Sequence, residues 1–563
     1  MTKLRTLALF TLAPTRRRRT CAVGTQMKNL IFRSACLVVV AATTMATAQT
    51  FTDLYNFNNG PNDPHWNTTA QGRDGNMYST TPQVWTGQTG DVFKISPTGT
   101  VTDLFTFDGT DGGYVSAGLT LGLDGNFYGA AASGGSHGFG TVFKVTPGGT
   151  VTTLYNFTNG ADGAEPSAPP IQGLDGNFYG NASSCAALYE FPCDLDVTYG
   201  SIYKITREGA FKVLHTFSGP DGINPFGQLL QGTDGDIYGM TMAGGVNGVG
   251  TVFKISTTGD FTVLYTFDGR HGAYPLSGGL IQGYDGNFYG LTSEGGSSGA
   301  GVLFKITPGG KLTIVYDFAD SGCCSLPNGG MVQATDGNFY GTTVFGGNIF
   351  RITPSGEFTD LANIGGSPQS VMMQHTNGIL YSGNAVGGSF DRGYFFSMNV
   401  GLAPFVSFLP AARPVGGVVE ILGQGFTGAT GVSFNGTPAA FTVESDTYLT
   451  AHVPAGATTG NITVTEPSGT LTSNKTFQVT PQVFSFSPTS GPVGSSVVIT
   501  GESFTGAMYV TLACKWLMSF TVDSDTQITA IVPPEATSGT IGTIAVRTPG
   551  GKYESAARFT VTP

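Results

Sequence analysis

The sequence predicts an all-β protein made of a seven-bladed β-propeller followed by two immunoglobulin-like β-sandwiches. First, a marker of the type Asp-Gly-Asn-aromatic-Tyr recurs about every 50 residues, a period typical of propellers and solenoids. Second, the segments between markers are short, rich in β-branched and aromatic residues, and without a helical period. Third, the period changes to 78 or 79 residues in the C-terminal part of the chain. With 85 Gly among 563 residues and 40% hydrophobic residues, the chain is rich in turns and can still fill a core.

Residues 1–48 are predicted to be an export signal, with Met27 as an alternative start. A short basic segment after Met27 leads into an apolar run, and Ala46 and Ala48 then supply the small residues that a signal peptidase accepts. A membrane anchor would need about 20 apolar residues, and this run is shorter. We expect cleavage after Ala48 and a secreted or cell-surface protein that begins at Gln49 and has no membrane span.

Residues 49–402 are predicted to form the propeller, with four short strands in each repeat. Asp-Gly between alternating apolar residues is a strong hairpin signal, because both central residues of that turn need positive φ. We therefore interpret the Asp residues of the marker as structural. A calcium site would need further oxygen ligands at fixed spacing, and calcium is the one cofactor that the pattern leaves open. The marker begins at Asp74, Asp124, Asp175, Asp234, Asp285, Asp336 and, in degenerate form, Asn377.

Two other motifs recur with the marker and suggest how the ring closes. Val-Phe-Lys-Ile and Thr-x-Leu-Tyr-x-Phe each have seven copies when degenerate ones are included, and the first copy of the latter ends at Phe57, ahead of any marker. We predict that residues 51–57 supply the outer strand of the blade whose other strands lie in residues 366–399. One sheet would then join the two ends of the ring and leave no exposed blade edge.

The best-formed repeat runs from Asp124 to Phe157. It contains Asp-Gly-Asn-Phe-Tyr-Gly, a Gly-Gly loop, Gly-Thr-Val-Phe-Lys-Val-Thr-Pro-Gly-Gly and Thr-Leu-Tyr-Asn-Phe. This pattern resembles the tandem repeat called GloVer, and the resemblance covers residues 51–400. It implies an exported bacterial protein and brings no established catalytic residues. The seventh copy departs from the pattern at Ile379 and Leu380.

Two copies of one domain follow, at residues 403–480 and 481–563. Pro-Val-Gly, Gly-x-x-Phe-Thr-Gly-Ala and Ser-Asp-Thr occur in both copies. These motifs are similar to those of IPT/TIG domains, and the resemblance implies spacers or adhesive modules. The second copy departs from the first at Cys514-Lys-Trp-Leu-Met518. We interpret Trp516 as packed into the sandwich or its neighbour, with an exposed contact site as the alternative.

Charge and cysteine usage narrow the class of protein. Residues 1–48 hold eight Lys/Arg and no Asp/Glu, which leaves 18 basic against 37 acidic residues, a formal charge of −19, for the rest. This argues against nucleic acid as a partner, because binding phosphates needs clustered cations.

Cys185 and Cys193 lie in the one insertion that lengthens a repeat, and we predict a disulfide between them, as suits an oxidising compartment. The states of Cys323, Cys324 and Cys514 stay open.

We find no catalytic constellation in the sequence. Gly134-Gly-Ser136-His-Gly138 has the spacing of a nucleophile elbow, but that motif requires a helix after it, and none is predicted. The six His residues lack the close pairings of a zinc site, so no metal ligand is assigned.

We favour an exported, non-catalytic binding or adhesion protein with the C-terminal domains as spacers. A carbohydrate-active hydrolase or lyase with its site on one propeller face, and a structural cell-surface component, are the alternatives.

The expected partner is an extracellular glycan or a surface protein, and strand order predicts which propeller face binds it. The turns after the first and third strands share one face and barely vary, whereas the connections on the opposite face carry nearly all the irregularity. Function tends to lie on such loops. One interpretation of the Asp residues there is a repeated Asp-Gly turn; the other is an acidic, aromatic-rimmed mouth for a cation or a sugar. The candidate ligand-face residues are His65, Trp66, Tyr114, His137, Arg270, His271, Tyr274, Asp111, Asp162 and Asp221.

Overall fold

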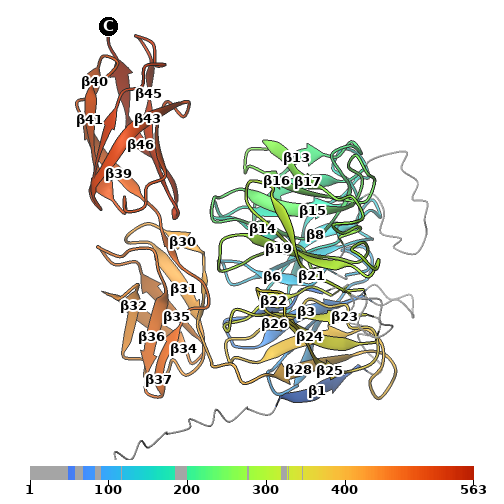
Figure 1. The fold of residues 1–563 in the computed structure, drawn as a ribbon. Coiled ribbons are helices and arrows are strands. Elements are labelled where there is room, and N and C mark those ends of the chain that lie inside the picture. The colour runs from blue at the N-terminus through green and yellow to red at the C-terminus, as the bar shows by residue number, and fades with distance from the viewer. Residues whose placement is uncertain are drawn as a thin grey trace, which may run out of the picture. The chain divides into compact units, whose positions relative to one another are not determined.

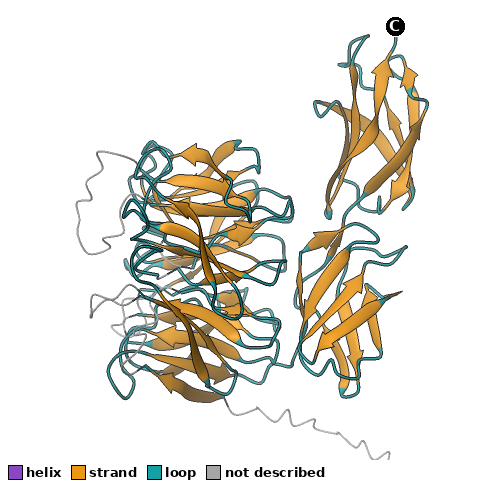
Figure 2. Ribbon diagram, turned by 180° about the vertical axis from the view of Figure 1, so that it is seen from behind, coloured by secondary structure: helices purple, strands orange, loops and turns teal. Residues whose placement is uncertain are grey.

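The structure is a computed structural model, and it describes residues 49–57, 67–82, 90–115, 117–183, 199–275, 278–318, 326–327, 329–344 and 346–563. All regular secondary structure in these residues is β-strand (Figure 2). Strands up to Asn399 gather in one body of four-stranded sheets, and strands from Ser407 onward form two sandwiches (Figure 1). The predicted all-β fold, a propeller followed by sandwiches, is confirmed.

The described residues between Thr50 and Asn399 form seven antiparallel four-stranded sheets, which we number as blades in chain order. In blades 1 to 6 the strands follow chain order from the innermost to the outermost. The blades are β2 (Ala70–Gln71), β3 (Met77–Thr81), β4 (Asp91–Ile95), β5 (Val101–Thr106); β6 (Leu119–Leu121), β7 (Phe127–Ala131), β8 (Thr141–Val145), β9 (Val151–Asn156); β10 (Ile171–Gln172), β11 (Phe178–Ala182), β12 (Ser201–Ile205), β13 (Phe211–Thr216); β14 (Ile223–Gln231), β15 (Ile237–Ala243), β16 (Thr251–Ile255), β17 (Phe261–Thr266); β18 (Ile281–Gln282), β19 (Phe288–Thr292), β20 (Val302–Ile306), β21 (Leu312–Asp317); and β22 (Val332–Gln333), β23 (Phe339–Thr343), β24 (Asn348–Ile352), β25 (Phe358–Asn363).

Blade 7 joins the two ends of the propeller. It contains β26 (Met373–Gln374), β27 (Leu380–Asn384) and β28 (Tyr394–Asn399), and its fourth strand is β1 (Thr50–Asn56). β1 pairs antiparallel with β28, with Phe51 opposite Met398. Phe57, directly after β1, packs in one cluster with Phe93 of blade 1 and Phe395 of blade 7. The prediction that residues 51–57 and 366–399 share a sheet is confirmed.

The aromatic residues of the marker hold neighbouring blades together. Tyr78 of blade 1 stacks on Phe127 of blade 2 with ring centroids 4.0 Å apart, and Tyr128 stacks on Phe178 of blade 3 at 3.7 Å. The residue after the marker tyrosine is Gly in blades 2 to 6 because a third-strand aromatic ring lies over it. A Cβ on Gly129 would lie 2.4 Å from Cζ of Phe143. The repeated Phe-Tyr-Gly thus encodes packing within and between blades.

The Asp of the marker closes its own turn. Oδ1 of Asp124 accepts a hydrogen bond from the Asn126 N–H (3.1 Å), and Oδ2 accepts from Asn126 Nδ2 (2.7 Å) and the Tyr128 hydroxyl (2.9 Å). Burial acts to raise the pKa of Asp124, but the hydrogen bonds from Asn126 and Tyr128 outweigh burial and lower that pKa. Because the same bonds recur at four other markers, these carboxylates are structural. The four are at Asp74, Asp175, Asp285 and Asp336.

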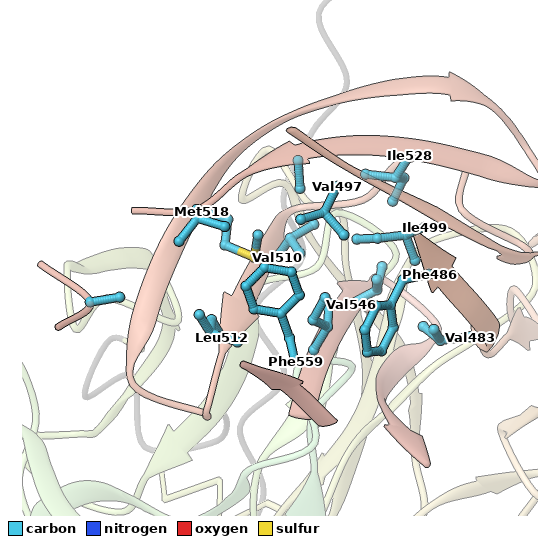
Figure 3. Packing of buried hydrophobic residues seen from close by; sticks show 14 of the residues in the cluster. Val483, Phe486, Val497, Ile499, Val510, Leu512, Met518, Ile528, Val546 and Phe559 are labelled. Atoms are coloured by element: carbon cyan, nitrogen blue, oxygen red, sulfur yellow. The ribbon is translucent and has the colours of Figure 1, made fainter. Parts of the chain in front are cut away.

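The two sandwiches have separate cores of alternating apolar residues. In the second, Phe559 packs beside Val510, Leu512 and Val546 (Figure 3). The first consists of β29 (Ser407–Leu409), β30 (Ala412–Arg413), β31 (Val418–Leu422), β32 (Gly431–Phe434), β33 (Thr437–Ala439), β34 (Phe441–Ser445), β35 (Tyr448–His452), β36 (Ile462–Glu466), β37 (Gly469–Thr472) and β38 (Gln478–Val479). The second consists of β39 (Gln482–Ser487), β40 (Ser490–Gly491), β41 (Ser496–Glu502), β42 (Tyr509–Leu512), β43 (Trp516–Ser524), β44 (Gln527–Ile531), β45 (Ile541–Thr548) and β46 (Gly551–Val561).

The departure at Cys514–Met518 changes one strand of the second sandwich. In the first sandwich β33 and β34 are separate strands in different sheets, whereas β43 runs continuously and pairs with both β42 and β44. Trp516, the first residue of β43, is half-buried and packs against the core, in agreement with a packing role. Cys514 is an exposed free thiol.

The first sandwich contacts the propeller next to the first marker. Nη2 of Arg73 lies 2.6 Å from Oε1 of Glu420, and the Arg73 guanidinium lies 4.9 Å from the ring centroid of Tyr448. Leu422 packs in the same cluster as Tyr78 and Phe127 of the propeller. Part of the face that carries the Asp-Gly-Asn turns is therefore covered by the chain itself.

Candidate ligand face of the propeller

The two faces of the propeller differ in how regular their connections are. We call the face with the Asp-Gly-Asn turns the turn face, and the opposite face, which carries the connections after each second and fourth strand, the loop face. The turn-face hairpins repeat with the same hydrogen bonds, whereas the loop-face connections differ in length and composition from blade to blade. Six residues singled out from the sequence, His65, Trp66, Cys185, Cys193, Cys323 and Cys324, lie outside the described residues.

The three candidate Asp residues each lie in a loop-face turn directly after an outer strand. The Asp162 carboxylate is buried and accepts hydrogen bonds from the Thr158 N–H (2.8 Å), the Thr158 hydroxyl (2.7 Å), the Gly160 N–H (3.0 Å) and the Tyr155 hydroxyl (3.0 Å). Burial acts to raise its pKa, but the bonds from Thr158 and Gly160 outweigh burial and lower that pKa. This geometry agrees with the interpretation of a repeated Asp-Gly turn.

The carboxylates of Asp221 and Asp111 lie in equivalent turns and accept fewer hydrogen bonds than that of Asp162. Asp221 accepts from the Ser218 N–H (2.8 Å), and its Oδ2 lies 2.9 Å from Nε2 of His215. Oδ1 of Asp111 accepts a long bond from the Asp108 N–H (3.3 Å), and burial raises the pKa of Asp111. These carboxylates organise the turns that follow the outer strands.

The basic candidates lie on the same connections. In blade 4, His271 takes the place of the Asp. Its backbone N–H donates to Oδ1 of Asp268, and its ring Nδ1 lies 2.7 Å from Oδ2 of the same carboxylate. Arg270, next to it, is exposed. His137 is also exposed, with its Nδ1 3.1 Å from Oγ of Ser136. Because no helix follows Ser136, the strand-to-helix turn of a nucleophile elbow is not formed there.

Tyr114 and Tyr274 occupy equivalent positions where a loop-face connection enters the inner strand of the next blade. Both have positive φ, 50° and 51° respectively, and both are half-buried. Three further residues share this position and conformation, Glu165, Asn224 and Leu326. The sequence analysis missed these three, although a following proline marks four of the five connections.

The axis of the propeller is nearly closed below this level. Inner segments of neighbouring blades bond to each other, as where the Leu119 N–H donates to the Thr68 carbonyl (3.0 Å). A Cβ on Gly278 would lie 2.3 Å from Cα of Gly330, so only Gly fits there. A hollow between inner segments has room for about one water and is lined by Thr68, Ala117, Ser167, Ala168, Phe226, Gly227, Gln228, Gly278 and Val371. This hollow is too small for a ligand of sugar size.

Within the described ranges, no three or more His, Cys, Asp or Glu side chains lie close enough together to hold a metal ion. The part of the chain that the structure describes also contains no helix that could cross a membrane.

A body of four-stranded blades joined to two sandwiches defines a multidomain β-propeller protein. The chain belongs to the Gloeobacter/Verrucomicrobia repeat family, whose model matches residues 38–189 and 195–349, more than half of the sequence. The IPT/TIG domain model matches residues 405–479 and 481–561. Both resemblances drawn from the sequence are confirmed.

Comparison with solved structures returns proteins of diverse activity. A virginiamycin B lyase from Staphylococcus aureus is 14% identical, with a TM-score of 0.44, over 62% of this chain and 99% of that one. A gluconolactonase from Xanthomonas campestris is 12% identical, with a TM-score of 0.34, over 63% and 90% of the two chains. A surface glycan-binding protein from Prevotella bryantii is 18% identical, with a TM-score of 0.20, over 28% and 41%. We draw no argument about activity from similarities of this size. No curated protein matches the sequence significantly.

Proposed function

We propose that this protein is an exported binding protein in which the propeller presents a ligand on its loop face and the two IPT/TIG domains act as spacers. The observation that carries the proposal is the contrast between the faces. One face repeats the same hairpin and is partly covered by the first sandwich. The other combines variable loops with a rigid scaffold, which is where binding residues concentrate in proteins.

The ligand that this face suits best is a neutral extracellular glycan. The body of the protein carries a formal charge of −19, which disfavours anionic ligands. Tyr114 and Tyr274 are half-buried at the mouth, and aromatic rings of this kind combine an apolar surface with a polar hydroxyl. Thr68, Ser167 and Gln228, which have polar side chains, are among the residues that line the hollow between the inner segments. A sugar offers the matching combination of apolar ring faces and hydroxyl groups.

Export through the N-terminal signal is part of the same proposal. Cleavage after Ala48 would release a protein that begins at Gln49, one residue before β1. An oxidising compartment would also allow the Cys185–Cys193 disulfide. Peptide mapping of secreted protein without reduction is expected to yield one linked peptide, and two free thiols at these positions would contradict the pairing.

The test is a glycan array probed with the mature chain, residues 49–563, with and without calcium. We expect binding to one class of neutral oligosaccharide. Release of products from a polysaccharide panel would favour a carbohydrate-active enzyme. Assembly of the protein alone, with no glycan bound, would favour a structural component and contradict the proposal.

A further inference from the structure

Eleven described residues other than glycine have positive φ, a backbone conformation that favours glycine, and five of them occupy the same place in successive connections. We call them the positive-φ ring. Left-handed φ costs free energy in any residue with a Cβ, because Cβ approaches the following carbonyl oxygen. Isolated cases occur in turns, but five at one repeated position form a pattern. The ring consists of Tyr114 (φ 50°), Glu165 (54°), Asn224 (53°), Tyr274 (51°) and Leu326 (56°).

Glycine would remove this strain, and the chain uses glycine freely elsewhere. Two residues before each of the first four ring members lies a Gly, and every one of those glycines has positive φ. These are Gly112, Gly163, Gly222 and Gly272. At the ring positions the chain carries a side chain where the backbone conformation favours glycine. Residues held in such conformations cluster at ligand-binding sites, which makes the ring a candidate for one.

The strain is maintained by contacts with the preceding blade. The N–H of Glu165 donates to the Phe139 carbonyl (2.9 Å), and the N–H of Tyr274 donates to the Val249 carbonyl (3.0 Å). Asn224 and Leu326 make the equivalent bonds, to Tyr199 and Ala300. The proline that follows also lies against the preceding blade, since a Cβ on Gly140 would lie 2.8 Å from Cδ of Pro166. These four side chains thus start from a fixed backbone position.

The ring lies beside the closed end of the axis. Glu165 and Asn224 are each two residues before a residue that lines the hollow, Ser167 and Phe226 respectively. Asn224 is buried and accepts a hydrogen bond from the Ser183 hydroxyl (3.1 Å), which gives it a structural role. The other four members are half-buried, so part of each side chain is accessible.

We propose that Tyr114, Glu165 and Tyr274 are specificity-determining residues that recognise a neutral saccharide at the mouth, an inference that rests on the proposed function. The two phenol rings supply flat apolar surfaces for the faces of pyranose rings, and the Glu165 carboxylate accepts hydrogen bonds from sugar hydroxyls. Because the backbone is fixed, little conformational freedom is lost on binding. Differences in side chain between members of the positive-φ ring then determine which sugar binds.

The test compares substitutions at one ring position with a matched substitution on the turn face. The probes are arrayed gluco-, manno-, galacto- and xylo-oligosaccharides, followed by calorimetry with the best of them. We expect at least tenfold weaker binding for both Tyr274→Ala and Tyr274→Gly in the mature full chain. The control is Tyr284→Ala, which removes a half-exposed turn-face tyrosine beside Asp285 and is expected to leave affinity unchanged.

A second readout needs no ligand. Tyr274→Gly should have a higher melting temperature than Tyr274→Ala, because only the former relieves the positive φ. Equal melting temperatures would overturn the argument from strain. Binding that survives both Tyr274 variants and Tyr114→Ala would refute the role of the positive-φ ring and leave the proposed function standing. Binding lost only with Tyr284→Ala would place the ligand on the turn face and overturn both. Failure of the unmodified protein to bind any probe would overturn both.

Discussion

Closure of the propeller by β1 makes the substitution Phe57→Ala a sharp test of how the ring is held together. Phe57 is 1% exposed and comes from the N-terminal end of the propeller. Its ring centroid lies 5.7 Å from that of Phe93 in blade 1, and the same cluster includes Tyr381 and Phe395 of blade 7. One side chain therefore joins blades whose strands lie roughly 300 residues apart in the sequence.

The expected cost follows from burial. An aromatic side chain buries roughly 150 Å² or more, and at about 25 cal/mol per Å² its removal from water contributes ~4 kcal/mol. Measured costs of Phe→Ala in cores are about 3–5 kcal/mol, which agrees. A loss of this size is a large fraction of the ~5–15 kcal/mol by which a domain is stable. The matched control is Phe217→Ala, at the same repeat position, 3% exposed and 5.5 Å from Phe253.

The assay is hydrogen exchange followed by mass spectrometry on the mature chain, with urea unfolding as the global measure. Phe57→Ala should lower the unfolding midpoint about as much as Phe217→Ala. It should also speed exchange in two distant peptides at once, β28 of blade 7 and β4 of blade 1. The closure argument would be refuted if Phe57→Ala lowered the free energy of unfolding by less than about 1 kcal/mol while Phe217→Ala lowered it by the full amount. That result would mean that β1 frays like the end of an open array.

Three further predictions follow from other contacts. Tyr179→Phe removes a hydrogen bond to Asp175 (2.7 Å) and should cost about 1.5–3 kcal/mol at pH 7. Burial acts to raise the pKa of Asp175, but its hydrogen bonds outweigh burial and lower that pKa. The stabilisation from this bond is therefore present above the unfolded-state pKa of about 3.9 and is lost as pH falls through the lower folded-state pKa. Urea unfolding should show a smaller difference in stability between the unmodified protein and Tyr179→Phe at pH 3 than at pH 7. Arg73→Ala removes the guanidinium that pairs with the buried Glu420 carboxylate and should speed hydrogen exchange in β31. Adding Glu420→Gln should reverse this effect, and exchange unchanged by Arg73→Ala would argue against the contact. N-terminal sequencing of secreted protein should begin at Gln49, and a mature protein that begins at Met1 or Met27 would contradict export.

Repetition made the fold predictable from the sequence. Each hairpin is specified by residues a few positions apart: the Asp-Gly turn, the alternating apolar residues and the marker tyrosine all act within one blade. Counting the copies of three motifs was also enough to place residues 51–57 in the sheet of blade 7. The structure adds why the marker reads Phe-Tyr-Gly, since those residues pack against partners in the third strand and in the next blade.

The candidate site depends on contacts between blades, which no local pattern encodes. Tyr114 and Tyr274 were chosen from the sequence because their loops vary, but their shared positive φ, and the equivalence of Glu165 and Leu326, became visible only in three dimensions. The backbone N–H groups of Glu165, Tyr274 and Leu326 are held by carbonyl groups of the preceding blade. In the same way, Arg73 meets Glu420 across 347 residues of sequence. Short-range hydrogen bonds and side-chain alternation determine strands and turns, whereas the ring of strained side chains exists only because the blades close around a common axis.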